Sequence, residues 1–285
     1  MRIWNFISVV IILITYLSCG SSKIYIHKLQ RLEDLGKIET NISQIGLWHI
    51  QDEWLIIFNP SYNRFYIYKD FKLQGIPIPI KEKDLQCFLF RKQPGVIYVF
   101  PKSSNVFSVY SLGGRKIFKR KITMLKQAID VVFSPHGYLY ILDKSGCIIK
   151  TDYEGETLGK FRNYSRGGHF KLLLPNPDQL ILLCRNGDMI LYDALGHYIR
   201  TEHVNKLKNV QDICFDNYGH VFFANKTGIW VSKNRKLKLI LKGKYNTIGH
   251  NGTDWFLIQK ESKIIRYKVH YDKIEQPIQK PVDIF

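Results

Sequence analysis

The sequence lacks the short motifs that mark most enzyme active sites. It contains no G-x-S-x-G, no H-E-x-x-H and no phosphate-cradling loop. Its five cysteines form no C-x-x-C pair, and its nine histidines are scattered along the chain. These absences argue against a nucleophile elbow, a zinc-peptidase site and a structural metal site. We expect no catalytic residue, no metal and no cofactor.

Cysteines that could pair are few as well. Four remain after Cys19, and each falls within or beside an expected strand: Cys87, Cys147, Cys184 and Cys214. We expect buried thiols rather than a disulfide framework.

Long apolar runs are confined to the start of the chain. Arg2 precedes the apolar run Ile7–Leu17, which is too short for a confident membrane span and fits a signal peptide. The sequence Leu17-Ser18-Cys19-Gly20 then resembles a bacterial lipobox. This resemblance implies that residues 1–18 are removed and that Cys19 carries lipid, which would anchor the protein to a membrane of the bacterial cell envelope. An ordinary signal peptide with an incidental cysteine and a retained helical anchor are the alternatives.

A repeat of 41 residues organises the chain. Gly146, Gly187 and Gly228 are separated by this step, and Asp130 recurs two steps later as Asp212. A period of this size predicts a solenoid, a propeller or another array. Within one unit, the runs 129–133, 138–142, 147–151 and 157–161 are rich in β-branched and aromatic residues and are bounded by turn residues. Four short strands per repeat predict the blades of an all-β propeller.

Two of the repeats also resemble a known family. The segments that begin at Phe133 (FSPHGYLYILD) and Phe215 (FDNYGHVFFAN) are similar to the NHL repeat, F-D-x-x-G-x-L-Y-V-A-D. This resemblance implies six four-stranded antiparallel blades but no activity, because such propellers include both enzymes and binding proteins.

The expected organisation follows from this register. We expect a signal peptide at 1–18, a lipid-anchored segment at 19–43, six blades at 44–272 and a tail at 273–285. Blade six lacks an obvious final strand, and we expect Ile24–Leu29 to supply it. The rest of the segment up to Ser43 is expected to be helical or irregular.

Acidic residues are scarce relative to basic ones. The chain has 42 Lys and Arg against 24 Asp and Glu, a formal net charge of +18. In the expected fold, the outermost strands and their connections to the next blade cover residues 116–127, 158–169, 199–209 and 236–250. These four segments contain a single acidic residue, Glu202. The turns between the second and third strands of five blades each add a cation, and we call these residues the basic ring: Lys102, Lys144, Arg185, Lys226 and Lys260. A positive face would attract an anionic partner, although lysines also protect the edges of sheets without binding anything.

These features favour a protein-interaction or assembly scaffold without enzymatic activity. Its partners would be the membrane, through the lipid, and an envelope protein or another anionic envelope component. The alternative is a lactonase- or hydrolase-like propeller with a site in the central channel, which would need at least three convergent carboxylates or amides near the axis. Nucleic-acid binding fits the charge but not the export signal.

Overall fold

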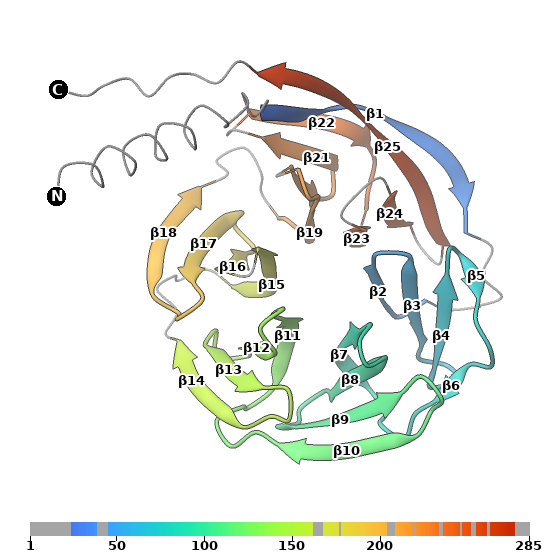
Figure 1. Ribbon diagram of the computed structural model, residues 1–285, viewed down its shortest axis with the longest axis vertical. Helices are drawn as coiled ribbons and strands as arrows, with labels where there is room; N and C mark the ends of the chain where they lie inside the picture. The colour runs from blue at the N-terminus through green and yellow to red at the C-terminus, as the bar shows by residue number, and fades with distance from the viewer. Residues whose placement is uncertain are drawn as a thin grey trace, which may run out of the picture. The chain divides into compact units, whose positions relative to one another are not determined.

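The structure is a computed structural model. It describes residues 24–38, 45–161, 168–176, 178–203, 209–218, 220–233, 236–245, 247–251, 255–260 and 263–276. The chain divides into two compact units. The larger unit, residues 32–269, is a ring of six antiparallel sheets around a central channel (Figure 1). The smaller unit contains residues 1–31 and 270–285, of which 24–31 and 270–276 are described.

The strands of each blade are lettered a to d from the centre of the propeller outward. Blade one contains β2 (Leu47–Gln51), β3 (Trp54–Asn59), β4 (Arg64–Lys69), β5 (Lys72–Leu73) and β6 (Ile78–Pro79). Blade two contains β7 (Leu85–Arg91), β8 (Val96–Pro101), β9 (Val106–Ser111) and β10 (Lys116–Lys121). Blade three contains β11 (Ala128–Phe133), β12 (Tyr138–Asp143), β13 (Ile148–Asp152) and β14 (Thr157–Phe161).

The second half of the ring repeats the plan. Blade four contains β15 (His169–Asn176), β16 (Gln179–Cys184), β17 (Asp188–Asp193) and β18 (Tyr198–His203). Blade five contains β19 (Asp212–Phe215), β20 (Val221–Ala224), β21 (Gly228–Lys233) and β22 (Lys236–Lys242). Blade six contains β23 (Thr247–His250), β24 (Trp255–Lys260), β25 (Lys263–Gln276) and, as its outermost strand, β1 (Ile24–Lys37). The expected six-bladed propeller is confirmed.

Blade one departs from the four-strand pattern at its outer edge. The fourth position is shared by β5 and β6, which both pair with β4. Gly75 and Pro77 lie between these two short strands. Glycine there adopts a φ of +64° and proline lacks an N–H donor, so a continuous strand cannot form.

The N-terminal strand occupies the position left open in blade six. β1 is the neighbour of β25, and the Ile38 N–H donates to the Ile264 carbonyl at 2.9 Å. The strand is longer than expected, because residues 30–37 continue it instead of forming a helical or irregular stretch. β25 likewise runs to Gln276, four residues past the expected end of the propeller at 272.

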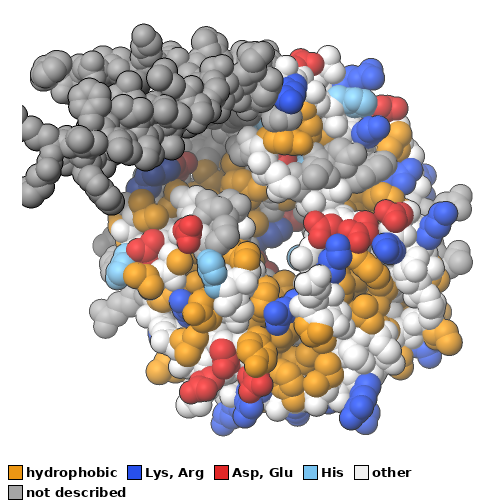
Figure 2. All heavy atoms as spheres, viewed as in Figure 1, with side chains coloured by type: hydrophobic (Ala, Val, Ile, Leu, Met, Phe, Trp, Pro, Cys, Tyr) orange, Lys and Arg blue, Asp and Glu red, His pale blue; other side chains and the backbone are white. Residues whose placement is uncertain are grey.

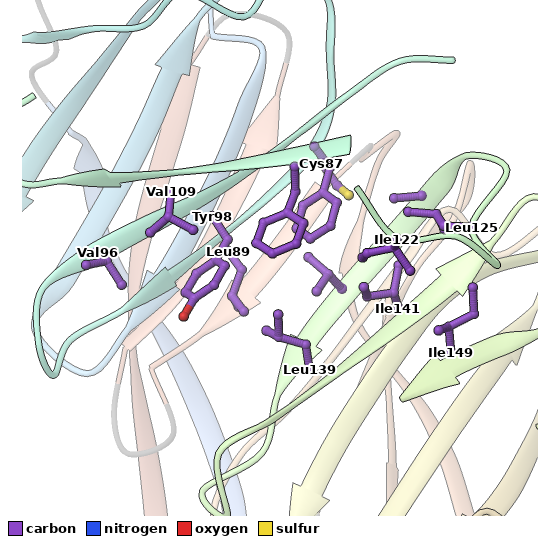
Figure 3. Close-up of a cluster of buried hydrophobic side chains, with 14 residues drawn as sticks. Cys87, Leu89, Val96, Tyr98, Val109, Ile122, Leu125, Leu139, Ile141 and Ile149 are labelled. Carbon is purple, nitrogen blue, oxygen red and sulfur yellow. The ribbon is translucent and has the colours of Figure 1, made fainter. Parts of the chain in front are cut away.

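Hydrophobic side chains fill the spaces between neighbouring blades. Figure 3 shows the cluster between blades two and three, where Leu89 and Tyr98 meet Leu139 and Ile141. Each blade therefore covers the faces of its neighbours, because a single four-stranded sheet cannot bury both of its own. Of the four cysteines, Cys87, Cys184 and Cys214 are buried and Cys147 is half-buried, and none forms a disulfide bond among the described residues.

Gly146 and Gly187 lie in the b–c turns of blades three and four, and Gly228, one 41-residue step further, is the first residue of β21, directly after the b–c turn of blade five. Gly146 and Gly187 have φ values of +83° and +92°, as expected for this turn. Gly228 does not adopt a positive φ. A Cβ on Gly228 would instead lie 2.2 Å from the Leu241 carbonyl oxygen, so the same position needs glycine for a different reason.

Candidate functional site

The basic ring lies in turns of one kind. Three of these cations directly follow the last residue of strand b in blades two, three and four: Lys102, Lys144 and Arg185. In blade five, Lys226 is the second residue after strand b. All b–c turns lie on one face of the propeller because strand a runs the same way in every blade; we call it the b–c face. Lys260 is the last residue of β24, and its side chain lies outside the described part of the chain.

Backbone hydrogen bonds fix these turns against the start of their own blade. The Lys102 N–H donates to the Asp84 carbonyl at 2.7 Å, the Lys144 N–H to Gln127 at 2.9 Å and the Arg185 N–H to Gly168 at 2.8 Å. In blade three, the buried Asp143 carboxylate also accepts from the N–H groups of Lys126, Gln127 and Ser145. The cations therefore project from rigid turns, which lowers the entropy lost on binding.

The four described ring side chains are exposed. None forms an ion pair with a described carboxylate, although the Arg185 guanidinium lies over the Phe170 ring, 5.3 Å from its centre. The a–b turns on the opposite face differ, because Lys92 in blade two lies 3.0 Å from the Glu53 carboxylate in blade one. On the face displayed in Figure 2, acidic side chains gather in separate groups around an opening at the centre.

The chain enters the larger unit on the face opposite the basic ring. β1 ends at Lys37, and Ile38 lies beside Ile264 at the start of β25, directly after the b–c turn of blade six. Because β1 is extended, its earlier residues in this unit lie toward the other face. The basic ring is thus on the far side of the propeller from the point of entry at Leu32.

The second candidate site is the central channel. The innermost strands of all six blades (β2, β7, β11, β15, β19 and β23) surround a cavity of about 390 Å³. Its wall is largely aliphatic, with contributions such as Val132, Leu173 and Ile248. The polar side chains on this wall include Asp130, Lys171, His49, Cys87 and Cys214.

Three charged residues occupy one repeat position in this channel. Asp130, Lys171 and Asp212 are separated by the 41-residue step and come from the inner strands of blades three, four and five. The Lys171 ammonium pairs with the Asp212 carboxylate. Asp130 accepts a hydrogen bond from the Leu172 N–H at 2.8 Å, and Asp212 accepts one from the Ile248 N–H at 2.8 Å. Each of these contacts joins a blade to the next one, and Asp212 also accepts a hydrogen bond from the Ile213 N–H of its own strand at 2.9 Å.

Burial and mutual attraction shift the protonation of the cluster. Burial raises the pKa of Asp130 to about 6, while the Lys171 ammonium opposes this rise. Burial alone would lower the pKa of Lys171, but the Asp212 and Asp130 carboxylates outweigh it and raise that pKa. At pH 7.5, above the pKa of Asp130, the Asp130 carboxylate is therefore ionised and the Lys171 amine is charged.

Three other titratable groups on this wall stay neutral at pH 7.5. Burial, helped by Lys171, lowers the pKa of His49 to about 4. Burial also raises the pKa of both the Cys87 and Cys214 thiols well above the usual value. These thiols are protonated and are not nucleophiles at neutral pH.

Lys171 was not predicted from the sequence. Asp130 and Asp212 are two repeat steps apart, and Lys171 stands at the step between them. The 41-residue period contained that signal, because 171 is the intermediate position.

The channel does not have the features of a lactonase-like metal site. Among the described residues, no group of three or more His, Cys, Asp or Glu side chains is arranged to hold a metal ion. The carboxylates of Asp130 and Asp212 are engaged by backbone N–H groups and, for Asp212, by Lys171. The enzyme alternative is not favoured. The described residues also include no helix that is long and apolar enough to cross a membrane.

Comparison with known proteins supports the fold. The crystal structure of the WD40 β-propeller domain of Doa1 is similar to this chain with a TM-score of 0.57. The match covers 86% of this chain and 97% of that domain at 10% sequence identity. No protein-family model and no curated protein match the chain. At this identity the likeness extends to the β-propeller fold and no further.

Proposed function

We propose that this protein is a lipid-anchored scaffold of the bacterial cell envelope that docks an acidic partner protein on its b–c face. The observation that supports this most is the repeated placement of exposed cations in the b–c turns of four consecutive blades, three of them hydrogen-bonded to the start of their own blade, without described carboxylate partners. Like charges at such spacing repel one another, modestly in salt. A partner with a complementary acidic patch converts this repulsion into attraction and speeds association.

The partner is more consistent with a protein than with the lipid surface that would hold the anchor. Cys19 and the lipobox lie outside the described residues, and the first described residue is Ile24. The chain enters the larger unit on the face opposite the ring, so the ring faces away from the point at which the N-terminal segment joins this unit.

The first prediction concerns the anchor. Replacing Cys19 with alanine removes the thiol that would carry the lipid, so the protein should leave the membrane fraction or accumulate with its leader attached. The measurement is detergent partitioning of extracts from cells that express either form. A Cys19→Ala protein that partitions into detergent exactly as the wild type does, with its leader removed, contradicts lipid anchoring.

The second prediction concerns the ring. Reversing Lys102, Lys144 and Lys226 to glutamate should weaken partner binding about tenfold or more, because attraction becomes repulsion at three docking points. Binding of the wild type should also weaken as ionic strength rises. The readout is the yield of proteins crosslinked to this chain in intact cells, quantified by mass spectrometry.

The outer strands supply a charge-matched control. Lys72, Arg115 and Lys268 are exposed at strand ends opposite the b–c turns, in β5, in the turn before β10 and in β25, and their reversal makes the same change in net charge. The melting temperatures of both triple variants should match the wild type. Equal crosslinking yields from the two variants would show that the basic ring does not bind the partner. A ring variant that loses anionic vesicles but keeps every protein partner would show a lipid-binding face instead.

A further inference from the structure

The charges in the central channel do not cancel. Asp130, Lys171 and Asp212 sum to −1 when both carboxylates are ionised. Lys171 is paired with Asp212. Asp130 receives a backbone N–H but has no cationic side chain in contact among the described residues. Asp130 is half-buried, so its carboxylate is partly desolvated without a full counter-charge, and a bound cation would reduce the cost of that desolvation.

The space beside Asp130 can hold such a cation. Around the ring at this level, the neighbour of Asp130 on the side away from Lys171 is Cys87, followed by Leu47. Thr247 continues the ring beyond Asp212. These three residues carry no charge, so within the described part of the chain no lysine or arginine lines this half of the channel.

The cavity is also accessible and of useful size. Its volume of about 390 Å³ exceeds that of a small amine by several fold. The Lys171 side chain retains 26% of its exposure, which shows that the channel communicates with solvent. Aliphatic side chains of the inner strands, such as Val132 and Leu173, line the space on the a–b side of the charged level. An apolar stem that ends in a charged nitrogen matches this combination.

We infer that the central channel binds a primary alkylammonium group, whose nitrogen contacts the Asp130 carboxylate and whose alkyl stem packs on the inner strands. The group belongs either to a small diffusible amine or to a lysine side chain of a docked protein. This site is separate from the basic ring, and it does not depend on the proposed scaffold function.

The test is a binding titration of the full chain with three probes at pH 7.5. The probes are n-butylammonium, Nα-acetyl-L-lysine methylamide and 1-butanol, the last being a neutral molecule of similar size. Binding is followed by the chemical shift of the Leu172 amide, whose N–H donates to Asp130. We expect n-butylammonium to shift this amide saturably and 1-butanol to bind at least tenfold more weakly.

Two changes isolate the carboxylate. Asp130→Asn keeps an acceptor for the Leu172 N–H but removes the charge, and it should weaken n-butylammonium binding at least tenfold. Asp70→Asn, at an exposed turn with a φ of +48° that asparagine tolerates, removes one charge elsewhere and should leave binding unchanged. Lowering the pH to 5 should weaken binding about tenfold, because Asp130 has a pKa of about 6 and becomes largely protonated. Of the other groups on this wall, Lys171 stays charged because its pKa is raised, the Cys87 and Cys214 thiols stay neutral because their pKa values are raised, and His49, with a pKa of about 4, stays largely neutral. Asp212 is paired with Lys171, and His250 lies on the same wall.

Each outcome decides the matter. Comparable binding of the lysine derivative assigns the site to a partner side chain, whereas its exclusion assigns it to a free amine. Equal binding of 1-butanol and n-butylammonium, unchanged binding by Asp130→Asn, or no binding of either cation would overturn the inference.

Discussion

Replacing Lys171 with methionine should lower the free energy of unfolding by about 3–5 kcal/mol, the usual cost of leaving a buried ion-pair partner uncompensated. Methionine preserves most of the volume, so the loss is electrostatic. Asp212 loses its ion pair and Asp130 loses the nearby charge that opposes its burial. Chemical denaturation of the wild type and the variant at pH 7.5 measures this difference.

The same variant should show a characteristic dependence on pH. The pKa of Asp130 in the folded state, about 6, exceeds that of an unfolded aspartate, about 3.9. The folded state therefore binds this proton more tightly than the unfolded state does. Asp130 contributes more to the stability of the folded state as the pH falls through 6 toward 4. Removing Lys171 raises the pKa of Asp130 further, so the cost of Lys171→Met should be smaller at pH 5 than at pH 7.5.

Controls separate the ion pair from general effects of charge. Lys119→Met removes an exposed cation from β10 and should change the free energy of unfolding by less than about 0.5 kcal/mol. The double variant Lys171→Met/Asp212→Asn should lose less unfolding free energy than the sum of the losses of the two single variants, because the two residues form a coupled pair. A loss below about 1 kcal/mol for Lys171→Met would mean that the inner cluster contributes little to blade association.

A second large effect is expected at a turn where two blades touch. Gly196, in the c–d turn of blade four, has a φ of +90°, and a Cβ there would lie 2.2 Å from the Phe161 ring of blade three. Phe161 is buried and cannot move freely. Gly196→Ala should therefore cost about 3–4 kcal/mol, the sum of a strained backbone and an overpacked contact.

Gly137 provides the matched comparison for this substitution. Its φ is +89°, nearly the same, but nothing lies within 4 Å of the position where a Cβ would stand. Gly137→Ala should then cost about 1 kcal/mol, from the backbone alone. Denaturation of the two variants side by side measures the contact between the blades. Equal costs would contradict a tight contact between Gly196 and Phe161.

The sequence predicted the repeating parts of this fold well. The four runs expected in residues 128–161 correspond to β11 to β14 within one residue at each end. The reason is physical, because alternating apolar residues between turn signals determine both the length of a strand and its buried face. The glycine register was equally informative at the b–c turns of three consecutive blades.

The parts without a repeat were harder to predict. Residues 30–37 contain charged residues on an edge strand with one exposed face, so their pattern resembles a polar loop, yet pairing with β25 makes them extended. The contacts of Asp130 and Asp212 with the next blade depend on how closely neighbouring inner strands approach one another. A local sequence pattern does not contain that information. Lys171 was missed for the same reason, since a lysine in a strand has many roles and only its contact with Asp212 distinguishes this one.

The measurement that tests the scaffold account most directly is site-specific photocrosslinking in intact cells. A photoreactive residue at Asn186, beside Arg185 in a b–c turn, probes the basic ring, and one at Tyr153, in an exposed c–d turn, probes the opposite face. We predict that Asn186 captures an acidic protein, that the capture falls in the Lys102→Glu/Lys144→Glu/Lys226→Glu background, and that Tyr153 does not capture it. Capture of this protein from Tyr153 alone, or capture from Asn186 that charge reversal leaves unchanged, would contradict the account.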